Sequence, residues 1–92
     1  MRAPAQMKPG TPMKSAKRME IGKHVVSDPE ICHGQLTFKG TRILVETVLS
    51  YLAAGRPIEW VLAEWPRLSR EAVQEALQLA AAALVERYRK AA

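Results

Sequence analysis

The apolar residues of this chain change their spacing at Val45, and that change limits the folds open to it. Before Val45 they stand in the short runs HVVS, QLTFK and TRILV, which have the length of short strands. After it, Val45, Val48, Leu49 and Leu52 follow the i, i+3, i+4, i+7 spacing of an amphipathic helix. The chain is therefore predicted to form short strands first and then helices, which the strands need as cover.

Two more helices are predicted, and their ends are marked by characteristic residues. Gly55 suits the position after the first helix. The second helix begins near Pro57 and ends at Pro66. Ser69 is the expected N-cap of the third helix, over about residues 70–89, and Glu71 lies in its first turn, where the helix dipole favours an acid. The predicted core face of this third helix consists of Val73, Ala76, Leu77, Ala80 and Leu84.

The last two helices and the turn PRLS between them fit a helix-turn-helix, although many antiparallel helix pairs have a similar pattern and bind nothing. The predicted fold is mainly α. A short N-terminal β-ribbon precedes a three-helix, helix-turn-helix domain of the homeodomain-like or winged-helix-like kind, over residues 21–92. Residues 1–20 carry cations and scattered prolines, and we expect them to form a disordered basic tail.

The positive charge of the chain is concentrated at its beginning. The formal net charge is +5. Residues 1–24 hold six Lys and Arg against Glu20, whereas residues 25–92 hold eight Lys and Arg and eight Asp and Glu. The predicted domain is therefore neutral, which argues against a broad basic platform for nucleic acid. The tail would bind phosphates in a salt-dependent way or serve only solubility.

Catalysis and membrane insertion have little support in the sequence. His24, Cys32 and His33 are the only soft metal ligands, and adjacent Cys32 and His33 lack the spacing of a zinc site. No nucleotide-binding or nucleophile motif is present. We expect no enzyme activity, no metal and no cofactor. With a single cysteine, no secretory signal and no apolar run long enough to span a bilayer, we expect a cytoplasmic protein with no membrane role.

The third helix carries a candidate DNA-binding flank. Arg70, Gln74 and Gln78 lie along one side of it, and Arg and Gln pair bidentately with guanine and adenine in the major groove. Glu71 and Glu75 lie alongside and would repel phosphates, so an ordinary polar flank is an equal alternative.

The segment FKGTRI supplies two further candidates for DNA contact. Gly40 is predicted to allow a positive-φ turn or bulge, with Phe38 and Ile43 packing inward. Lys39 and Arg42 would then be exposed and able to contact phosphates. A phosphate cradle is not indicated, because the segment has one glycine and does not directly open a helix.

A second apolar row on the third helix predicts a partner. Ala72, Ala76, Leu79 and Ala83 lie on the side away from Arg70. Because a helix that is apolar on two sides is usually covered on two sides, the second cover is either another chain or the strands of the same chain. Trp60, expected to project away from the stripe of the second helix, is a candidate interface anchor. We expect a homodimer.

The segments SDPEICHG (27–34), KGTRILV (39–45), LAAG (52–55) and WPRL with the following helix resemble the bacterial and archaeal family called domain of unknown function 433. The resemblance covers about residues 25–83. It implies a small helix-turn-helix-like domain behind a β-ribbon, and often the antitoxin partner of a PIN-like ribonuclease toxin. It supplies no catalytic residues. Here HGQL follows Cys32 where the family commonly has Gly-Gly-x-Pro, and Leu44 and Pro57 replace its usual proline and hydroxyl cap.

Two functional hypotheses follow. The first is an antitoxin-like regulator that neutralises a PIN-like toxin and binds operator DNA as a dimer. The alternative is a protein-interaction or dimerisation module with no DNA-binding role, which the neutral domain favours.

Overall fold

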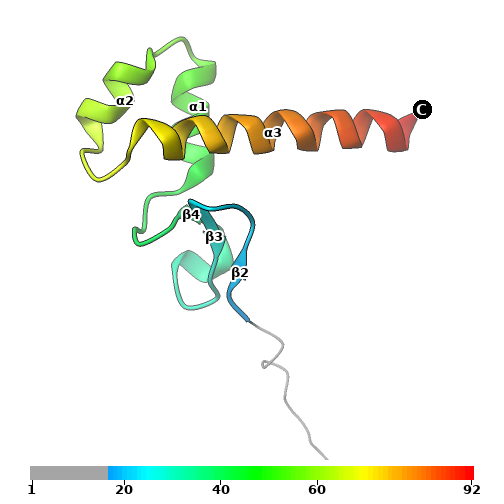
Figure 1. The fold of residues 1–92 in the computed structure, drawn as a ribbon, viewed down its shortest axis with the longest axis horizontal. Helices are drawn as coiled ribbons and strands as arrows, with labels where there is room; N and C mark the ends of the chain where they lie inside the picture. Colours follow the sequence, from blue (N-terminus) through cyan, green and yellow to red (C-terminus); the bar gives the residue numbers. More distant parts are fainter. Residues whose placement is uncertain (1–16) are drawn as a thin grey trace, which may run out of the picture.

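The structure, a computed structural model, describes residues 17–92 and shows three short strands followed by three helices (Figure 1). The rest of the predicted tail, residues 1–16, lies outside the described residues. The prediction of a mainly helical domain behind a short β-ribbon is confirmed. Its elements are β2 (Met19–Glu20), β3 (Val25–Ser27), the 3₁₀ turn η2 (Cys32–Gly34), β4 (Leu36–Phe38), α1 (Val45–Ala53), α2 (Ile58–Glu64) and α3 (Arg70–Ala91).

The sheet is antiparallel, and its strands lie in the order β2-β3-β4. In the central strand, Val26 pairs with Glu20 on one side and Thr37 on the other. The predicted strand TRILV is not formed: Leu44 makes only an isolated bridge with Thr37. The third strand is instead β2, which lies within the predicted disordered tail. Its two residues show no strand pattern of their own, and they form a strand by pairing with the backbone of β3.

The predicted helix ends are found in the structure. α1 ends before Gly55, whose φ of +102° is a conformation that side-chain-bearing residues rarely adopt. Pro57 immediately precedes α2. The Ser69 hydroxyl accepts a 3.1 Å hydrogen bond from the backbone N–H of Ala72, so it caps α3 as predicted.

The hydrophobic core lies where the helices meet β3 and β4. Phe38 from the sheet, Val48 from α1, Val61 from α2 and Val73 from α3 are all fully buried there. The sheet and each of the three α-helices thus contribute at least one side chain removed from water, and helices cover β3 and β4, as their short length requires.

The predicted core face of α3 is only partly correct. Val73 and Ala76 are buried, and Ala72 joins them, but Leu77 is 42% exposed and Leu84 is 69% exposed. Ala80 is exposed as well. The helix is rotated so that Ala72 rather than Leu77 faces the core, and Leu84 lies beyond the elements that could cover it.

α3 extends well beyond the elements that it packs against. Its 22 residues span about 33 Å, whereas the nine residues of α1 span about 14 Å. All residues from 81 to 92 are exposed. Figure 1 shows this half of α3, in orange and red, projecting from the rest of the domain. We call residues 81–91 the α3 arm.

Candidate functional site

α2 and α3 form the predicted helix-turn-helix. The connection covers residues 65–69, and Leu68 within it is 6% exposed and joins the core. The backbone N–H of Leu68 donates a 2.9 Å hydrogen bond to the carbonyl of Trp65. One buried side chain and the Ser69 cap therefore fix the position at which α3 begins.

The structure places Arg70, Gln74 and Gln78 on one flank of α3, and all three are exposed. The Arg70 guanidinium lies 3.1 Å from Oε2 of Glu59 on α2. The pKa of Glu59 is held below its ordinary value, first by a hydrogen bond from its own backbone and then by Arg70. Because this ion pair is exposed to solvent, it contributes little stability, and Arg70 can exchange Glu59 for another anion at small cost.

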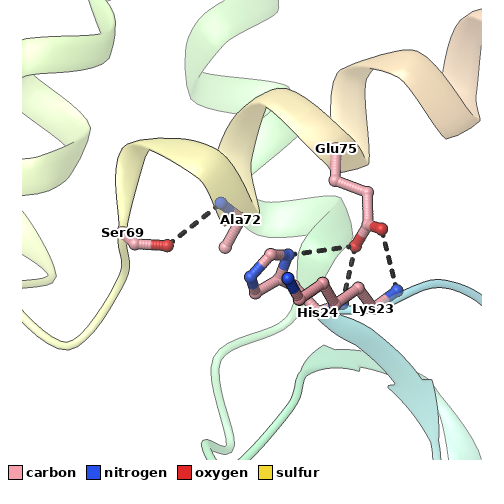
Figure 2. A network of polar contacts seen from close by, with 5 residues as sticks. All are labelled: Lys23, His24, Ser69, Ala72 and Glu75. Carbon is pink, nitrogen blue, oxygen red and sulfur yellow. Dashed lines mark hydrogen bonds and ion pairs between the residues drawn. The ribbon is translucent and has the colours of Figure 1, made fainter.

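Glu75 follows Gln74 directly in α3, but its carboxylate is bound by the ribbon and is not free beside the flank. Its carboxylate accepts hydrogen bonds from the backbone N–H groups of Lys23 (2.8 Å) and His24 (2.6 Å), in the loop between β2 and β3 (Figure 2). Nδ1 of His24 lies 3.4 Å from Oε1 of Glu75, an ion-pair distance when the imidazole is protonated. Glu75 therefore ties α3 to the ribbon, where its carboxylate faces two backbone N–H groups, whereas Glu71 remains exposed.

The loop that receives Glu75 is closely fitted to it. A Cβ atom at Gly22 would lie 2.9 Å from the Glu75 carboxylate, so any side chain there would push the carboxylate away. The hydrogen bond from His24 is the largest cause of a lowered Glu75 pKa. The absence of a side chain at Gly22 thus permits a long-range contact that the sequence pattern did not reveal.

The FKGTRI segment forms the predicted turn. Gly40 has a φ of +80°. The Thr41 hydroxyl donates to the carbonyl of Phe38 (2.8 Å) and accepts from the backbone N–H of Ile43 (3.0 Å), which closes the turn. Phe38 is buried, and Ile43 packs against the core, as predicted. The turn holds Lys39 and Arg42 at the surface.

The structure adds Arg67, which the sequence analysis did not single out, to this region. Arg67 lies in the turn before α3 and donates a 3.3 Å hydrogen bond from Nη2 to the carbonyl of Gly40. A shallow hollow of about 430 Å³ lies here, and it is lined by Ile31, Gly40, Thr41, Arg42 and Arg67. Two guanidinium groups therefore border one hollow beside the helix-turn-helix, and no carboxylate lines it.

Lys39 points to a different neighbour. Its Nζ lies 3.1 Å from Oε2 of Glu20 on β2, and this contact is the main cause of the lowered Glu20 pKa. The predicted phosphate contact at Lys39 is thus partly neutralised within the chain, whereas Arg42 makes no ion pair among residues 17–92.

The model of the family described as protein of unknown function (DUF433) matches residues 25–80, which is more than half of the chain. The chain belongs to this family. The fold of this DUF433 domain is also similar to a crystal structure of a DUF433 member protein from Anabaena variabilis ATCC 29413, with a TM-score of 0.61 and 28% sequence identity. That similarity covers 73% of this chain and 66%, just under two thirds, of the other. No curated protein matches the sequence.

The predicted partner row of this DUF433 domain is covered mainly by the chain itself. Ala72 and Ala76 are 5% and 2% exposed because they face the core. Leu79 is half-buried against that core, and Ala83 is exposed. The row is therefore not a free face, and the cover comes from within the chain, as the alternative interpretation held.

Trp60 is not the projecting anchor that was predicted. It is half-buried and belongs to an aromatic cluster, with ring centroids 5.0 Å from Tyr51 and 6.1 Å from Trp65. The guanidinium carbon of Arg56 lies 4.5 Å from the centroid of the Trp60 ring. This cluster joins α1 to α2, so Trp60 contributes to the packing of the two helices.

Within residues 17–92, no three or more His, Cys, Asp or Glu side chains gather into a group that would hold a metal ion. Cys32 and His33 lie in the η2 turn with φ values of +51° and +59°, and the Cys32 thiol lies 3.6 Å from the carbonyl of Arg42. No helix in the same part of the chain has the length and hydrophobicity to cross a bilayer.

Proposed function

We propose that this DUF433 domain is a binding protein rather than an enzyme: an antitoxin-like regulator that binds operator DNA through the helix-turn-helix of α2 and α3. The observation that carries the DNA half is the exposed flank of Arg70, Gln74 and Gln78, next to which the Glu75 carboxylate is bound by the ribbon. Side chains of these types make bidentate contacts with guanine and adenine edges.

The basic side chains around the flank supply a way to position it on DNA. Arg67 and Arg42 border one hollow beside the start of α3, and Arg70 forms only an exposed ion pair. Phosphate contacts fix the register of a DNA-binding protein, while base contacts give it specificity. On this proposal, the flank contacts the bases and the hollow, whose Arg67 lies three residues before Arg70, contacts the phosphates.

The DNA half is tested with the DNA upstream of the chain's own gene. We expect tighter binding to this DNA than to a shuffled sequence in fluorescence anisotropy titrations at physiological salt. The double variant Gln74→Ala, Gln78→Ala should lose the preference, while Arg89→Ala, which removes a cation outside the flank, should keep it. Equal affinity for both DNAs would remove operator binding from the proposal.

The antitoxin half concerns a PIN-like ribonuclease toxin in the cytoplasm, and it is supported by the family resemblance. We expect the product of a neighbouring PIN-like gene to co-purify with this chain and to lose its ribonuclease activity in the complex. A toxin that remains fully active at saturating concentrations of this chain would contradict the antitoxin half.

A second candidate function is a protein-interaction module without a DNA role. The exposed Leu84, Val85 and Tyr88 of the α3 arm favour it, since apolar side chains of this size are seldom left together in water without a partner. Under this alternative, co-purification with a partner would depend on the arm, and the flank variants would change nothing.

A further inference from the structure

Leu77, Ala81, Leu84 and Tyr88 form an exposed apolar stripe along α3, which we call the α3 stripe. Leu77 is 42%, Leu84 69% and Tyr88 72% exposed, and Ala81 is exposed too. Their spacing of four, three and four residues keeps them on one face, as in the seam of a coiled coil. The stripe lies to one side of the buried face of Ala72 and Ala76, so it is separate from the predicted partner row.

We propose that the α3 stripe binds the same stripe of a second copy of this chain, with the two helices antiparallel. A surface with this spacing is self-complementary, and twofold symmetry is the commonest arrangement of protein oligomers. The dimer itself does not depend on the proposed function, because the stripe is exposed whether or not the flank binds DNA.

Charge decides the orientation. The arm carries Arg87, Arg89 and Lys90 against Glu86, a net charge of +2. Parallel helices would place the two positive arms side by side. Antiparallel helices, in the register described next, place Arg87, Arg89 and Lys90 of each copy level with the uncharged Ala82, Ala80 and Leu79 of the other. Antiparallel packing also aligns the helix dipoles favourably.

Side-chain size decides the register. When Tyr88 of one copy lies opposite Ala81 of the other, the largest side chain of the stripe meets the smallest. The same register brings Leu84 next to Val85 of the other copy, which is 48% exposed and flanks the stripe. Close packing of large against small residues is how helix interfaces reach the density of protein interiors.

The charge of the tail argues against the chain's own N-terminal segment as the occupant. Residues 1–16 contain Arg2, Lys8 and Lys14 and no acid, so they have the same sign as the arm. A second copy in this register instead places uncharged residues level with the cations of the arm.

One consequence rests on the proposed function. In this register, Gln74 of the two copies would lie about 32 Å apart along the helices, from 1.5 Å per residue. Half-sites in successive major grooves are about 34 Å apart. The dimer would thus place the two Gln74 side chains, which lie beyond the overlap of the two helices, at about the separation that one turn of DNA requires.

Sedimentation equilibrium of the full chain tests the dimer. At about 100 µM, where micromolar complexes are populated, we expect a mass of two chains of 10.2 kDa each. Leu84→Glu should raise the dissociation constant more than about tenfold, with an unchanged circular dichroism spectrum. The control Ala82→Glu adds the same charge at an exposed position outside the stripe and should stay dimeric. A monomeric wild type, or a dimeric Leu84→Glu, would overturn the inference.

Disulfide trapping tests the orientation, in a Cys32→Ser background that removes the native thiol. Antiparallel packing predicts that Ala81→Cys and Tyr88→Cys chains, mixed and oxidised, form a mixed disulfide, while Tyr88→Cys alone stays uncrosslinked. Efficient crosslinking of Tyr88→Cys to itself would show a parallel pair and overturn the antiparallel assignment. If the chain forms the dimer but does not bind operator DNA, the result supports this inference and contradicts the DNA half of the proposed function.

Discussion

The carboxylate of Glu75 accepts a 2.6 Å hydrogen bond from the backbone N–H of His24, which lies 51 residues earlier in the chain. This contact joins α3 to the loop between β2 and β3, so the ribbon and the helix-turn-helix form one unit. It also binds the carboxylate of the acid that follows Gln74 of the candidate flank. One side chain therefore serves both the fold and the electrostatics of the candidate DNA-binding surface.

The pKa of Glu75 is lowered in the folded state, mainly by the His24 hydrogen bond. The Glu75 carboxylate therefore binds a proton more readily in the unfolded chain than in the folded one. Its stabilising effect is present at neutral pH and is lost as the pH falls through the folded-state pKa. We expect Glu75→Gln to lower the thermal midpoint at pH 7 and to lessen its decrease toward pH 3. Glu71→Gln, at an exposed position, is the control. Identical pH profiles for the two variants would contradict the role of Glu75.

Gly40 should tolerate substitution only at a conformational cost. Its φ is +80°, and a Cβ atom there would meet nothing within 4 Å, so the penalty comes from the backbone alone. We expect Gly40→Ala to lower the free energy of unfolding by about 1 kcal/mol, measured by urea denaturation. Gly40→Asn should lower the free energy of unfolding less, because asparagine adopts a positive φ more readily than alanine. An unchanged free energy of unfolding in Gly40→Ala would contradict this prediction and show that the turn adopts another backbone conformation at no cost.

Ser69 caps the helix that carries the flank. We expect Ser69→Ala to lower the free energy of unfolding by about 1 kcal/mol. Ser69→Asp should retain most of the stability of the cap, because aspartate also accepts a hydrogen bond from a first-turn N–H. Chemical denaturation monitored by circular dichroism measures both. A Ser69→Asp variant as unstable as Ser69→Ala would mean that the hydroxyl bond to Ala72 is not the source of the stability.

Arg67 and Gln74 should affect DNA binding in different ways. Arg67→Ala removes a candidate phosphate contact, so binding should weaken for all sequences. The slope of log affinity against log salt concentration should fall in magnitude by about one. Gln74→Ala should cost about 1–3 kcal/mol at one base pair of the operator and relax the preference there. Titrations at several salt concentrations against single-base operator variants separate the two effects. The same uniform loss for both variants would contradict base contact by Gln74.

The sequence predicted most of what depends on neighbouring residues. Ser69, Pro57 and Gly55 marked helix ends because capping and backbone constraints act within a few positions. The exposure of the α3 flank followed from its spacing. The rotation of α3 could not be predicted this way, because its apolar residues allow two core faces and contacts with distant segments choose between them.

Contacts between distant segments were the main omissions. Glu75 was interpreted as a surface acid because its partners are backbone N–H groups of another segment. The residues next to Glu75 in the sequence do not indicate these partners. β2 was missed because Met19–Glu20 has the composition of the tail. Arg67 was not singled out, since its position beside Gly40 arises only when the turn before α3 approaches the FKGTRI turn.

The exposure of the α3 arm divides one helix into two regions of different local stability. In a single copy, the amide hydrogens of the arm are released by fraying at low free-energy cost, while those near Val73 are released only when the domain unfolds. Any chain that covers the arm slows hydrogen exchange there first and changes the region near Val73 far less. Exchange rates along α3 therefore report association and folding separately within the same molecule.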